Sequence, residues 1–367
     1  MRPDCFTIGK NFRIDGEFLT SEPWGSGHIN NTYRVIYQQS KVPVKYILQR
    51  INHHVFNNPV GLMQNINRVI DHQKKKLLLE KDSDISRNCL TLIHAQDGKP
   101  YYQDQEGCYW RTYCFIENTC SYDIIQSPQQ AYETAKAFGR FQKRLTDLPS
   151  NELVETIPDF HNTPKRFNDF VQAVNLDAHN RAIDCQKEIK FAEKRQSITH
   201  RLLDLHKRGD IPQRITHNDT KLNNVLFDKN TQKGVCVIDL DTIMPGLTLY
   251  DFGDLVRTST NPVAEDEQDL SKVNAQMDIF EALTKGYLEA VGRFLNPAEK
   301  SCMVFSGKLI TLELGLRFLT DHLNGDLYFP VMRKGHNLDR CKTQFRLMAS
   351  LESQENAMNR IVESLCG

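Results

Sequence analysis

The segment from residue 216 to residue 241 constrains the fold of this chain more than any other stretch. Two short apolar runs, 225–227 and 235–238, enclose a polar turn. Such runs around a turn are typical of a β-hairpin. The residue that enters the first strand of a hairpin lies beside the residue that leaves the second. We therefore expect Asn224 and Asp239 to meet at one end of the hairpin.

Oxygen-bearing side chains gather at this end of the predicted hairpin. Asp219 lies on the loop that leads into the first strand, five residues before Asn224, and Asp239 follows the second strand. Strand alternation would place Asp241 on the same side as Asp239 if the strand extends that far. In phosphoryl transfer a loop Asp orients the attacking hydroxyl, and oxygen ligands hold Mg²⁺. The loop from His217 to Asn224 matches the His-x-Asp-x4-Asn loop of kinases, so it predicts phosphoryl transfer.

An Asp-Phe-Gly triplet at 251–253 spells the metal-binding motif of protein kinases, but it lies outside the hairpin. It follows Asp239 by twelve residues and cannot face Asn224. We therefore expect Asp251 or Asp254 to cap the next helix. The chain also lacks an Ala-Pro-Glu segment, which argues against a protein substrate.

A glycine-containing turn, Gly25-Ser26-Gly27, lies between two predicted strands. Backbone N–H groups in such a turn can approach phosphates, although turns of this kind are also common in hairpins. The strand lysine of kinases is absent, because Gln49 stands at its place with Arg50 beside it. Successive strand residues face opposite sides, so at most one of the two points towards the phosphates, and the sequence leaves open which.

Strand and helix signals divide the chain into two parts. Alternating or apolar runs predict strands in the first part, at residues 32–37, 44–48, 90–94, 101–103 and 109–116. Apolar residues at helical spacing predict a helix at 59–79. After about Ser121 the pattern is helical, and we expect the apolar stripe of 131–145 to be core rather than a ligand site. This organisation predicts an α+β fold with a small β-rich N-lobe and a mostly helical C-lobe.

The composition limits the partners that we expect. Lysine plus arginine and aspartate plus glutamate both total 46, so no net field favours nucleic acid or an anionic membrane surface. The N-terminus lacks the apolar core of a signal peptide, and no apolar run is long enough to span a bilayer. The ten cysteines include no CxxC pair. We therefore expect a cytoplasmic protein with reduced thiols that binds neither nucleic acid nor membrane.

On these features the chain resembles the small-molecule kinases of the aminoglycoside phosphotransferase and choline kinase superfamily. Within it, the chain is most similar to bacterial N-acetylhexosamine 1-kinases, which share the Gln49-Arg50 pair. The resemblance rests on residues 25–30, 46–50, 110–111, 115–117, 216–224, 238–246, 317–319 and 325–329. It implies a bilobal protein-kinase-like fold, with an N-lobe at 1–118, a hinge near 115–118 and a C-lobe at 119–367.

The same resemblance implies the roles of individual residues. ATP would lie between the lobes, against Gly25, Ser26, Gly27, Phe115, Ile116 and Glu117. Asp219 would be the catalytic base, with Asn224 and Asp239 as Mg²⁺ ligands, and the sugar would contact His28, Arg317 and Tyr328. Arg317 also has a structural alternative, an ion pair with Glu313 four residues earlier on the same helix.

The expected activity is ATP-dependent phosphorylation of the anomeric C1 hydroxyl of N-acetylglucosamine or N-acetylgalactosamine. Because fold does not fix substrate, the acceptor could instead be another sugar, choline, homoserine or an aminoglycoside. A metal-dependent hydrolase could hold two ions with His217, Asp219, Asp239 and Asp241. A nucleotide-binding protein without turnover is a further alternative, and loop His, Asn and Asp often only bond their own backbone. The matched spacing to Asn224 and Asp239 favours a functional loop.

Overall fold

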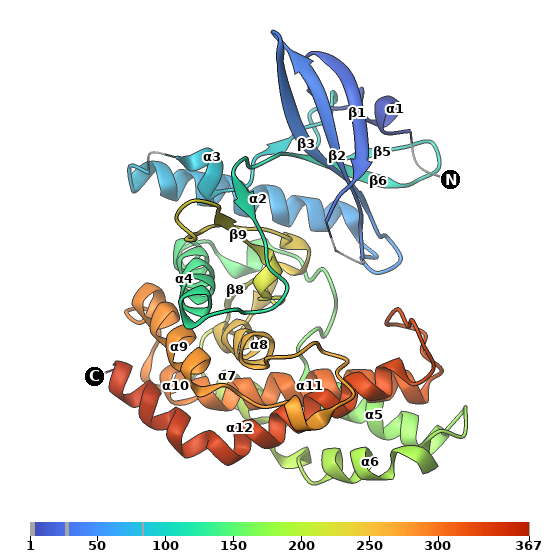
Figure 1. Cartoon of the computed structure of the whole chain (residues 1–367), viewed down its shortest axis with the longest axis vertical. Coiled ribbons are helices and arrows are strands. Elements are labelled where there is room, and N and C mark those ends of the chain that lie inside the picture. The colour runs from blue at the N-terminus through green and yellow to red at the C-terminus, as the bar shows by residue number, and fades with distance from the viewer. Residues whose placement is uncertain (1–3, 26–28, 83, 367) are drawn as a thin grey trace.

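The computed structural model describes residues 4–25, 29–82 and 84–366 and separates into a sheet-rich upper part and a larger helical lower part (Figure 1). The upper part is an antiparallel sheet with the strand order β1-β2-β3-β6-β4, in which β5 also pairs with β6. The strands are β1 (Glu17–Pro23), β2 (Asn31–Gln39), β3 (Val42–Ile51), β4 (Leu92–Ile93), β5 (Tyr102–Gln103) and β6 (Tyr109–Cys114). This architecture confirms the predicted α+β class.

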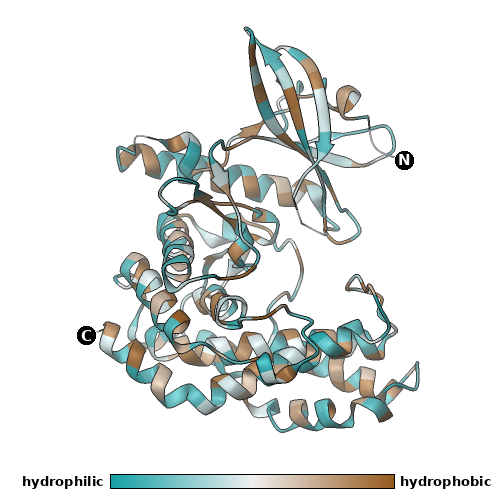
Figure 2. Cartoon of the chain, in the orientation of Figure 1, coloured by the Kyte–Doolittle hydropathy of each residue, from teal (hydrophilic) through white to brown (hydrophobic). Residues whose placement is uncertain are grey.

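The two faces of this sheet have different surroundings. On one face Tyr46 and Leu48 of β3 join Trp110 of β6 in a small apolar core. Their neighbours Ile47 and Gln49 point to the other face, because side chains alternate along a strand, and both line a cavity between the two parts. Figure 2 shows this alternation as hydrophobic and hydrophilic residues that follow one another along the long strands.

Helix α2 (Pro59–Leu79) lies between the upper sheet and the lower part (Figure 1) and has the predicted bounds. It begins there because the side chain of Asn58 accepts a hydrogen bond from the N–H of Gly61 at 2.9 Å and Pro59 occupies the first turn. Two shorter helices, α1 (Cys5–Gly9) and α3 (Ile85–Asn88), complete the N-terminal region.

Helix α2 is bound to the lower part by a buried amide. The side chain of Asn65 donates to the carbonyl oxygens of Val154 at 2.8 Å and Ile243 at 3.0 Å, and it accepts from the N–H of Val154 at 3.0 Å. Gln73 donates to the carbonyl oxygen of Phe141 at 2.8 Å. The apolar residues of α2 belong to the large core of the lower part rather than to the small core of the sheet.

The lower part is built from helices around this large core. The stripe Ala135, Phe138, Phe141 and Leu145 is buried in it, which confirms the prediction that these residues are core. The helices are α4 (Pro128–Arg144), α5 (Thr163–Leu176), α6 (Gln186–Glu193), α7 (Arg201–Lys207), α8 (Thr248–Thr260), α9 (Met277–Val291), α10 (Pro297–Ser301), α11 (Met303–Leu323) and α12 (His336–Cys366).

Short strands cover the helices on the side that faces the upper sheet (Figure 1). Strands β9 (Val225–Asp228) and β10 (Gly234–Val237) form the predicted hairpin, and β7 (Thr119–Cys120) pairs with β9. Strands β8 (Arg214–Thr216) and β11 (Met244–Gly246) form a second pair. A Cβ atom at Gly246 would lie 2.2 Å from the hydroxyl of Thr216, so this close approach requires glycine.

Among the described residues, no helix combines the length and the apolar character needed to cross a membrane. All ten cysteines are free thiols, and several of them are buried.

Candidate active site

The hairpin β9–β10 brings its two ends together. The N–H of Ile238 donates to the carbonyl oxygen of Asn224 at 2.9 Å. The chain then leaves β10 through Asp239, whose φ of 60° lies in the left-handed region, and forms a short 3₁₀ turn over Leu240–Thr242. The strand therefore ends before Asp241, and the condition for aligning Asp239 with Asp241 by strand alternation is not met, although both residues line the same cavity.

Hydrogen bonds around His217 fix the loop that precedes β9. Because a carbonyl oxygen only accepts, His217 Nε2 carries the proton in its 3.0 Å contact with the carbonyl oxygen of Ile238. Its Nδ1 then accepts from the N–H of Asp219 at 3.3 Å. The side chain of Asn224 donates to the Asp219 carboxylate at 3.1 Å and to its carbonyl oxygen at 2.9 Å. Both ring nitrogens of His217 are thus occupied by backbone groups, and neither is available to a metal.

Two acids of α8 hold the same loop. The carboxylate of Asp251 accepts from the N–H groups of His217 at 2.9 Å and Asn218 at 2.7 Å, and Asp254 accepts from the N–H of Thr220 at 2.8 Å. The N-terminus of α8 has no side-chain cap. The expectation that Asp251 or Asp254 caps this helix is therefore wrong, because the buried backbone amides of the tight loop bind both carboxylates instead.

Asp219 carries its own positive partner. Lys221 Nζ lies 2.7 Å from the Asp219 carboxylate. Burial alone would raise the pKa of Asp219, but the ammonium group of Lys221 outweighs this effect, and the pKa is lowered. Asp219 is therefore ionised at neutral pH and can accept a hydrogen bond or a proton from a hydroxyl.

Asp239 has the opposite environment. Its carboxylate makes no hydrogen bond or ion pair with any residue that the structure describes, and its side chain is open to the cavity. Desolvation by the surrounding protein, followed by the charges of Asp241 and Asp219, raises the pKa of Asp239 to about 7. An unsatisfied carboxylate of this kind favours binding of a cation.

Asp241 is already neutralised. Its Oδ1 is paired with Arg111, whose side chain is also buried, and its Oδ2 accepts from the side-chain amide of Asn30 at 2.6 Å. Both carboxylate oxygens of Asp241 and both ring nitrogens of His217 are therefore engaged. The two-ion hydrolase would lose two of its proposed ligands, so this geometry argues against it.

A cavity of about 600 Å³ separates the upper sheet from the β9–β10 hairpin. This volume is typical of small-molecule sites. One end is mainly apolar, and the other end collects the polar groups described above. The apolar end includes Trp24, Ile47, Phe115, Ile116 and Leu226, and the polar end includes Arg111, Asp219, Lys221, Asn224, Asp239 and Asp241.

The residues predicted to contact the nucleotide lie partly on this cavity. Phe115 and Ile116 line it, and so does Gly25, whose φ of +81° lies in the left-handed region that favours glycine. Glu117 is not among the residues that line it, and its carboxylate pairs with Lys45 at 3.1 Å. Ser26, Gly27 and His28 lie outside the described residues.

Arg317 and Tyr328 lie together on the lower part and are not among the residues that line the cavity. The Arg317 guanidinium stacks over the rings of Phe160, Tyr328 and Phe329 at 5.0, 5.9 and 5.5 Å from their centroids. It makes no ion pair with Glu313. The oxygens of Glu313 are instead taken by His161 at 2.7 Å and Thr163 at 2.5 Å, so the structural alternative for Arg317 is wrong.

His161 connects this aromatic patch to the loop. Its Nδ1 lies 2.7 Å from Glu313, and its Nε2 lies 3.3 Å from the carbonyl oxygen of Asn218. Asn218 directly precedes Asp219, and Phe160, which stacks with Arg317, directly precedes His161. The patch therefore adjoins the loop through a buried contact.

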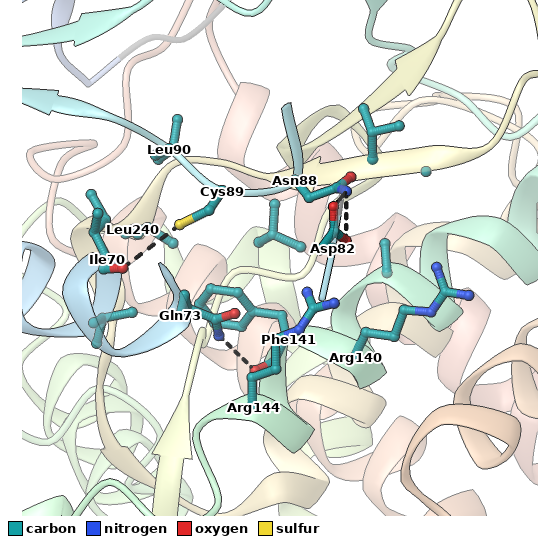
Figure 3. Close-up of a pocket in the computed structure, with 15 residues that line it drawn as sticks. Ile70, Gln73, Asp82, Asn88, Cys89, Leu90, Arg140, Phe141, Arg144 and Leu240 are labelled. Atoms are coloured by element: carbon teal, nitrogen blue, oxygen red, sulfur yellow. Dashed lines mark hydrogen bonds between the residues drawn. The ribbon is translucent and has the colours of Figure 1, made fainter. Parts of the chain in front are cut away.

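A second cavity, of about 70 Å³, lies among α2, α4 and β10 (Figure 3). Its walls contain the Gln73–Phe141 hydrogen bond, the Cys89 thiol and the guanidinium groups of Arg140 and Arg144. It has room for a few water molecules, since about 10–15 Å³ of such space is enough to hold one. None of the predicted site residues that the structure describes lines it.

A loop Asp, a loop Asn and a strand-end Asp, set between a β-rich part and a helical part, define a kinase-like phosphotransferase. The profile of the phosphotransferase enzyme family, APH, matches residues 20–280, and the chain belongs to this family.

Solved structures share the fold over nearly the whole chain. An aminoglycoside phosphotransferase from Alicyclobacillus acidocaldarius is 12% identical with a TM-score of 0.64, covering 98% of this chain and 97% of its own. A choline kinase from Cryptosporidium parvum is 16% identical with a TM-score of 0.56, covering 99% of both. A choline/ethanolamine kinase family protein from Mesorhizobium loti is 14% identical with a TM-score of 0.53, covering 95% and 92%. At these identities the likeness extends to the fold and not to the substrate.

Sequence reasoning missed several residues of the polar end. Lys221 had a signal, because it lies two residues after Asp219 in the loop itself. Arg111 and Asn30 lie in stretches that carry the resemblance, but no local pattern joins them to Asp241, which they reach from 130 and 211 residues away.

Proposed function

We propose that this chain transfers the γ-phosphoryl group of ATP to the anomeric C1 hydroxyl of an N-acetylhexosamine, giving the sugar 1-phosphate. The main support for phosphoryl transfer is the polar end of the cavity. There an ionised Asp219 and an Asp239 that no described cation pairs with line the same space. Asp219 acts as the catalytic base in this proposal.

The residues fit Mg²⁺ as a cofactor. Asn224 and Asp239 offer hard oxygen atoms, and Asp239 has no cationic partner among the described residues. These two side chains would hold the ion, which would neutralise charge on the transferred phosphate.

Asp219 would position the acceptor. The C1 oxygen forms a bond to the γ-phosphorus while the bond from this phosphorus to the β–γ bridging oxygen breaks, and ADP leaves. The hydroxyl proton passes to Asp219, whose lowered pKa keeps it ionised beforehand. An anomeric hydroxyl is more acidic than an ordinary alcohol, so Asp219 serves mainly to orient it.

The nucleotide would lie between two lobes. The first sheet ends at Cys114, and β7 of the second sheet begins at Thr119, so we place the hinge at 115–118, between lobes at 1–118 and 119–367. Phe115 and Ile116 would contact the adenine at the apolar end, with the turn at Gly25 to Gly27 near the phosphates.

Arg317 and Tyr328 support a neutral acceptor that offers oxygen atoms. The guanidinium of Arg317 stacks on aromatic rings and has no carboxylate partner among the described residues. The pKa of Arg166 is lowered by burial and then by the charge of Arg317, so two positive groups lie close together. This surrounding disfavours choline or an aminoglycoside and suits the hydroxyl and acyl oxygens of an N-acetylhexosamine. His28 would be the remaining sugar contact.

The test is a panel of acceptors with ATP and Mg²⁺. It contains N-acetylglucosamine, N-acetylgalactosamine, glucose, galactose, choline, homoserine and an aminoglycoside. We expect ADP release with the two N-acetylhexosamines and a phosphorus NMR signal of a sugar 1-phosphate. Turnover with choline, or phosphate at another hydroxyl, would contradict the acceptor and leave the phosphotransferase class intact.

Arg317→Met separates the acceptor site from the transfer site. We expect the KM for the sugar to rise about 30-fold, as for the loss of a charge-assisted hydrogen bond, while nucleotide affinity stays unchanged. Arg293→Met, at an exposed position two residues after the end of α9, is the matched control. An unchanged KM in Arg317→Met would remove Arg317 from the acceptor site.

A further inference from the structure

A row of polar side chains crosses the inner face of the upper sheet. In the antiparallel register Thr32 of β2 pairs with Gln49 of β3, and Gln49 pairs with Arg111 of β6. Directly opposite residues project to the same face of a sheet, and all three line the cavity. Arg50 projects to the other face and does not line the cavity, so it is not the cation that replaces the missing strand lysine.

The row orients Arg111. Gln49 Nε2 donates to the hydroxyl of Thr32 at 2.9 Å, which turns its amide oxygen towards Arg111 Nε, also at 2.9 Å. Arg111 Nη1 pairs with Asp241 from the lower part. The Nη2 group has no hydrogen-bond partner among the described residues. With only 1% of its side chain exposed, Arg111 is held from two sides and keeps one donor group unused.

Asp241 joins three segments of the upper part to the lower part. Besides Arg111 on β6, it binds Asn30, which follows the glycine-containing turn. Asn30 in turn accepts from the N–H of Asn52, directly after β3, at 3.0 Å. The carboxylate of Asp241 thus fixes both the guanidinium of Arg111 and the side chain of Asn30 relative to the carboxylate of Asp239.

Positive charge near the phosphates is needed in phosphoryl transfer, and kinases supply it with a strand lysine. Among the described residues that line the cavity, the lysines and arginines are Arg111 and Lys221. Lys221 is paired with Asp219. Arg111 lies at the polar end, where the charges of Asp239 and Arg111 act on one another.

We propose that Arg111, oriented by Gln49 and Asp241, binds the β- and γ-phosphates of the nucleotide in place of a strand lysine. This proposal rests on the nucleotide site of the proposed function and is independent of the sugar. It makes Arg111 a phosphate-binding residue and Gln49 and Asp241 positioning residues.

The test is calorimetric titration of the whole protein with ATP, ADP and AMP in the presence of Mg²⁺. Arg111→Met should weaken ATP and ADP binding about 30-fold, the loss expected for a charge-assisted hydrogen bond, and AMP binding less than about twofold. Arg50→Met, on the opposite face of the sheet, is the matched control and should leave all three affinities unchanged.

Arg111→Met leaves a buried carboxylate without its partner and can fail to fold, so a second variant is needed. Arg111→Met with Asp241→Asn removes both charges of the pair, and its thermal midpoint shows that it is folded. We expect this double variant to keep the weak ATP and ADP binding. If the double variant bound ATP and ADP with wild-type affinity, Arg111 would serve only to neutralise Asp241, and the proposal would be overturned. Wild-type affinity for ATP and ADP in Arg111→Met itself would also overturn it. Absence of ATP binding in the wild-type protein would overturn the proposed nucleotide site instead.

Discussion

The loop at 216–224 and the turn at 238–242 each supply a carboxylate to the same cavity, but their electrostatic environments are opposite. Asp219 is paired with Lys221 and hydrogen-bonded by Asn224, and its pKa is lowered. Asp239 has no such partner among the described residues, and its pKa is raised to about 7. The first carboxylate is therefore ionised before any ligand binds, whereas in our proposal a bound cation neutralises the second.

This difference suits the two acids to the different roles that we propose for them. A group that receives a proton during transfer must be ionised beforehand, which the environment of Asp219 achieves. A metal ligand gains affinity when no protein cation competes for it, which is the state of Asp239. The neighbouring Asp241 shows the contrast, because Arg111 and Asn30 already neutralise it.

The substitution Asp219→Asn is the strongest test of the contrast between Asp219 and Asp239. We expect kcat to fall about 1,000-fold, within the range for loss of a general base, while the affinity for ATP and Mg²⁺ stays within a few-fold. Steady-state kinetics with calorimetry separates the two quantities. Asp210→Asn, a surface acid on the same part of the molecule, is the control. Turnover that persists within a few-fold would remove Asp219 from catalysis.

Asp239→Asn should show the reverse pattern. We expect Mg²⁺-dependent ATP binding to weaken at least about 100-fold, since even the outer partners of metal ligands contribute about 10–100-fold. Calorimetry with and without Mg²⁺ measures this effect, and Asp228→Asn in the same hairpin is the control. Unchanged affinity would contradict the metal role.

Lys221→Met should make the two acids more alike. Without the ammonium group, burial raises the pKa of Asp219, so the acidic limb of the kcat profile should move to higher pH. We expect kcat to fall about tenfold at neutral pH, corresponding to about 1.4 kcal/mol. Lys221→Arg keeps the charge and should restore the position of the limb. A profile that does not move in Lys221→Met would show that Lys221 does not set the ionisation of Asp219.

The smallest expected effect concerns the stability of the protein without ligands. Because the folded state raises the pKa of Asp239 from 3.8 to about 7, it binds a proton between these values that the unfolded chain releases. This group therefore lowers stability as pH rises through that interval. Asp239→Asn should raise the thermal midpoint by about 2 °C at pH 8 and leave it unchanged near pH 4, as differential scanning calorimetry can measure. An equal shift at both pH values would point to packing instead of charge.

Local patterns in the sequence predicted the elements that local rules control. Helix α2 has its predicted bounds because Asn58 and Pro59 define its first turn, and the β9–β10 hairpin follows from two apolar runs around a turn. The predicted hairpin also correctly placed Asn224 beside the end of the second strand, where Ile238, the residue before Asp239, donates a hydrogen bond to its carbonyl oxygen.

Long-range partners could not be predicted in this way. Asp251 follows the rules of a helix cap in the sequence, but the amides of His217 and Asn218 bind it in the fold. The partner of Glu313 is His161, 152 residues earlier, rather than Arg317 one turn away. In both cases, a buried group from a distant segment satisfies a charge for which the local sequence offered another partner.

The contacts of Asn65 have a mechanical consequence. Its three hydrogen bonds attach α2 to the backbone at Val154 and Ile243, while the strands of the upper sheet have a small core of their own. If the sheet swings outward to admit a nucleotide, the molecule should divide at residues 52–58, between β3 and α2. The helix would then move with the larger body, and the moving piece would be the small sheet, hinged at its three chain connections, 52–58, 89–91 and 115–118.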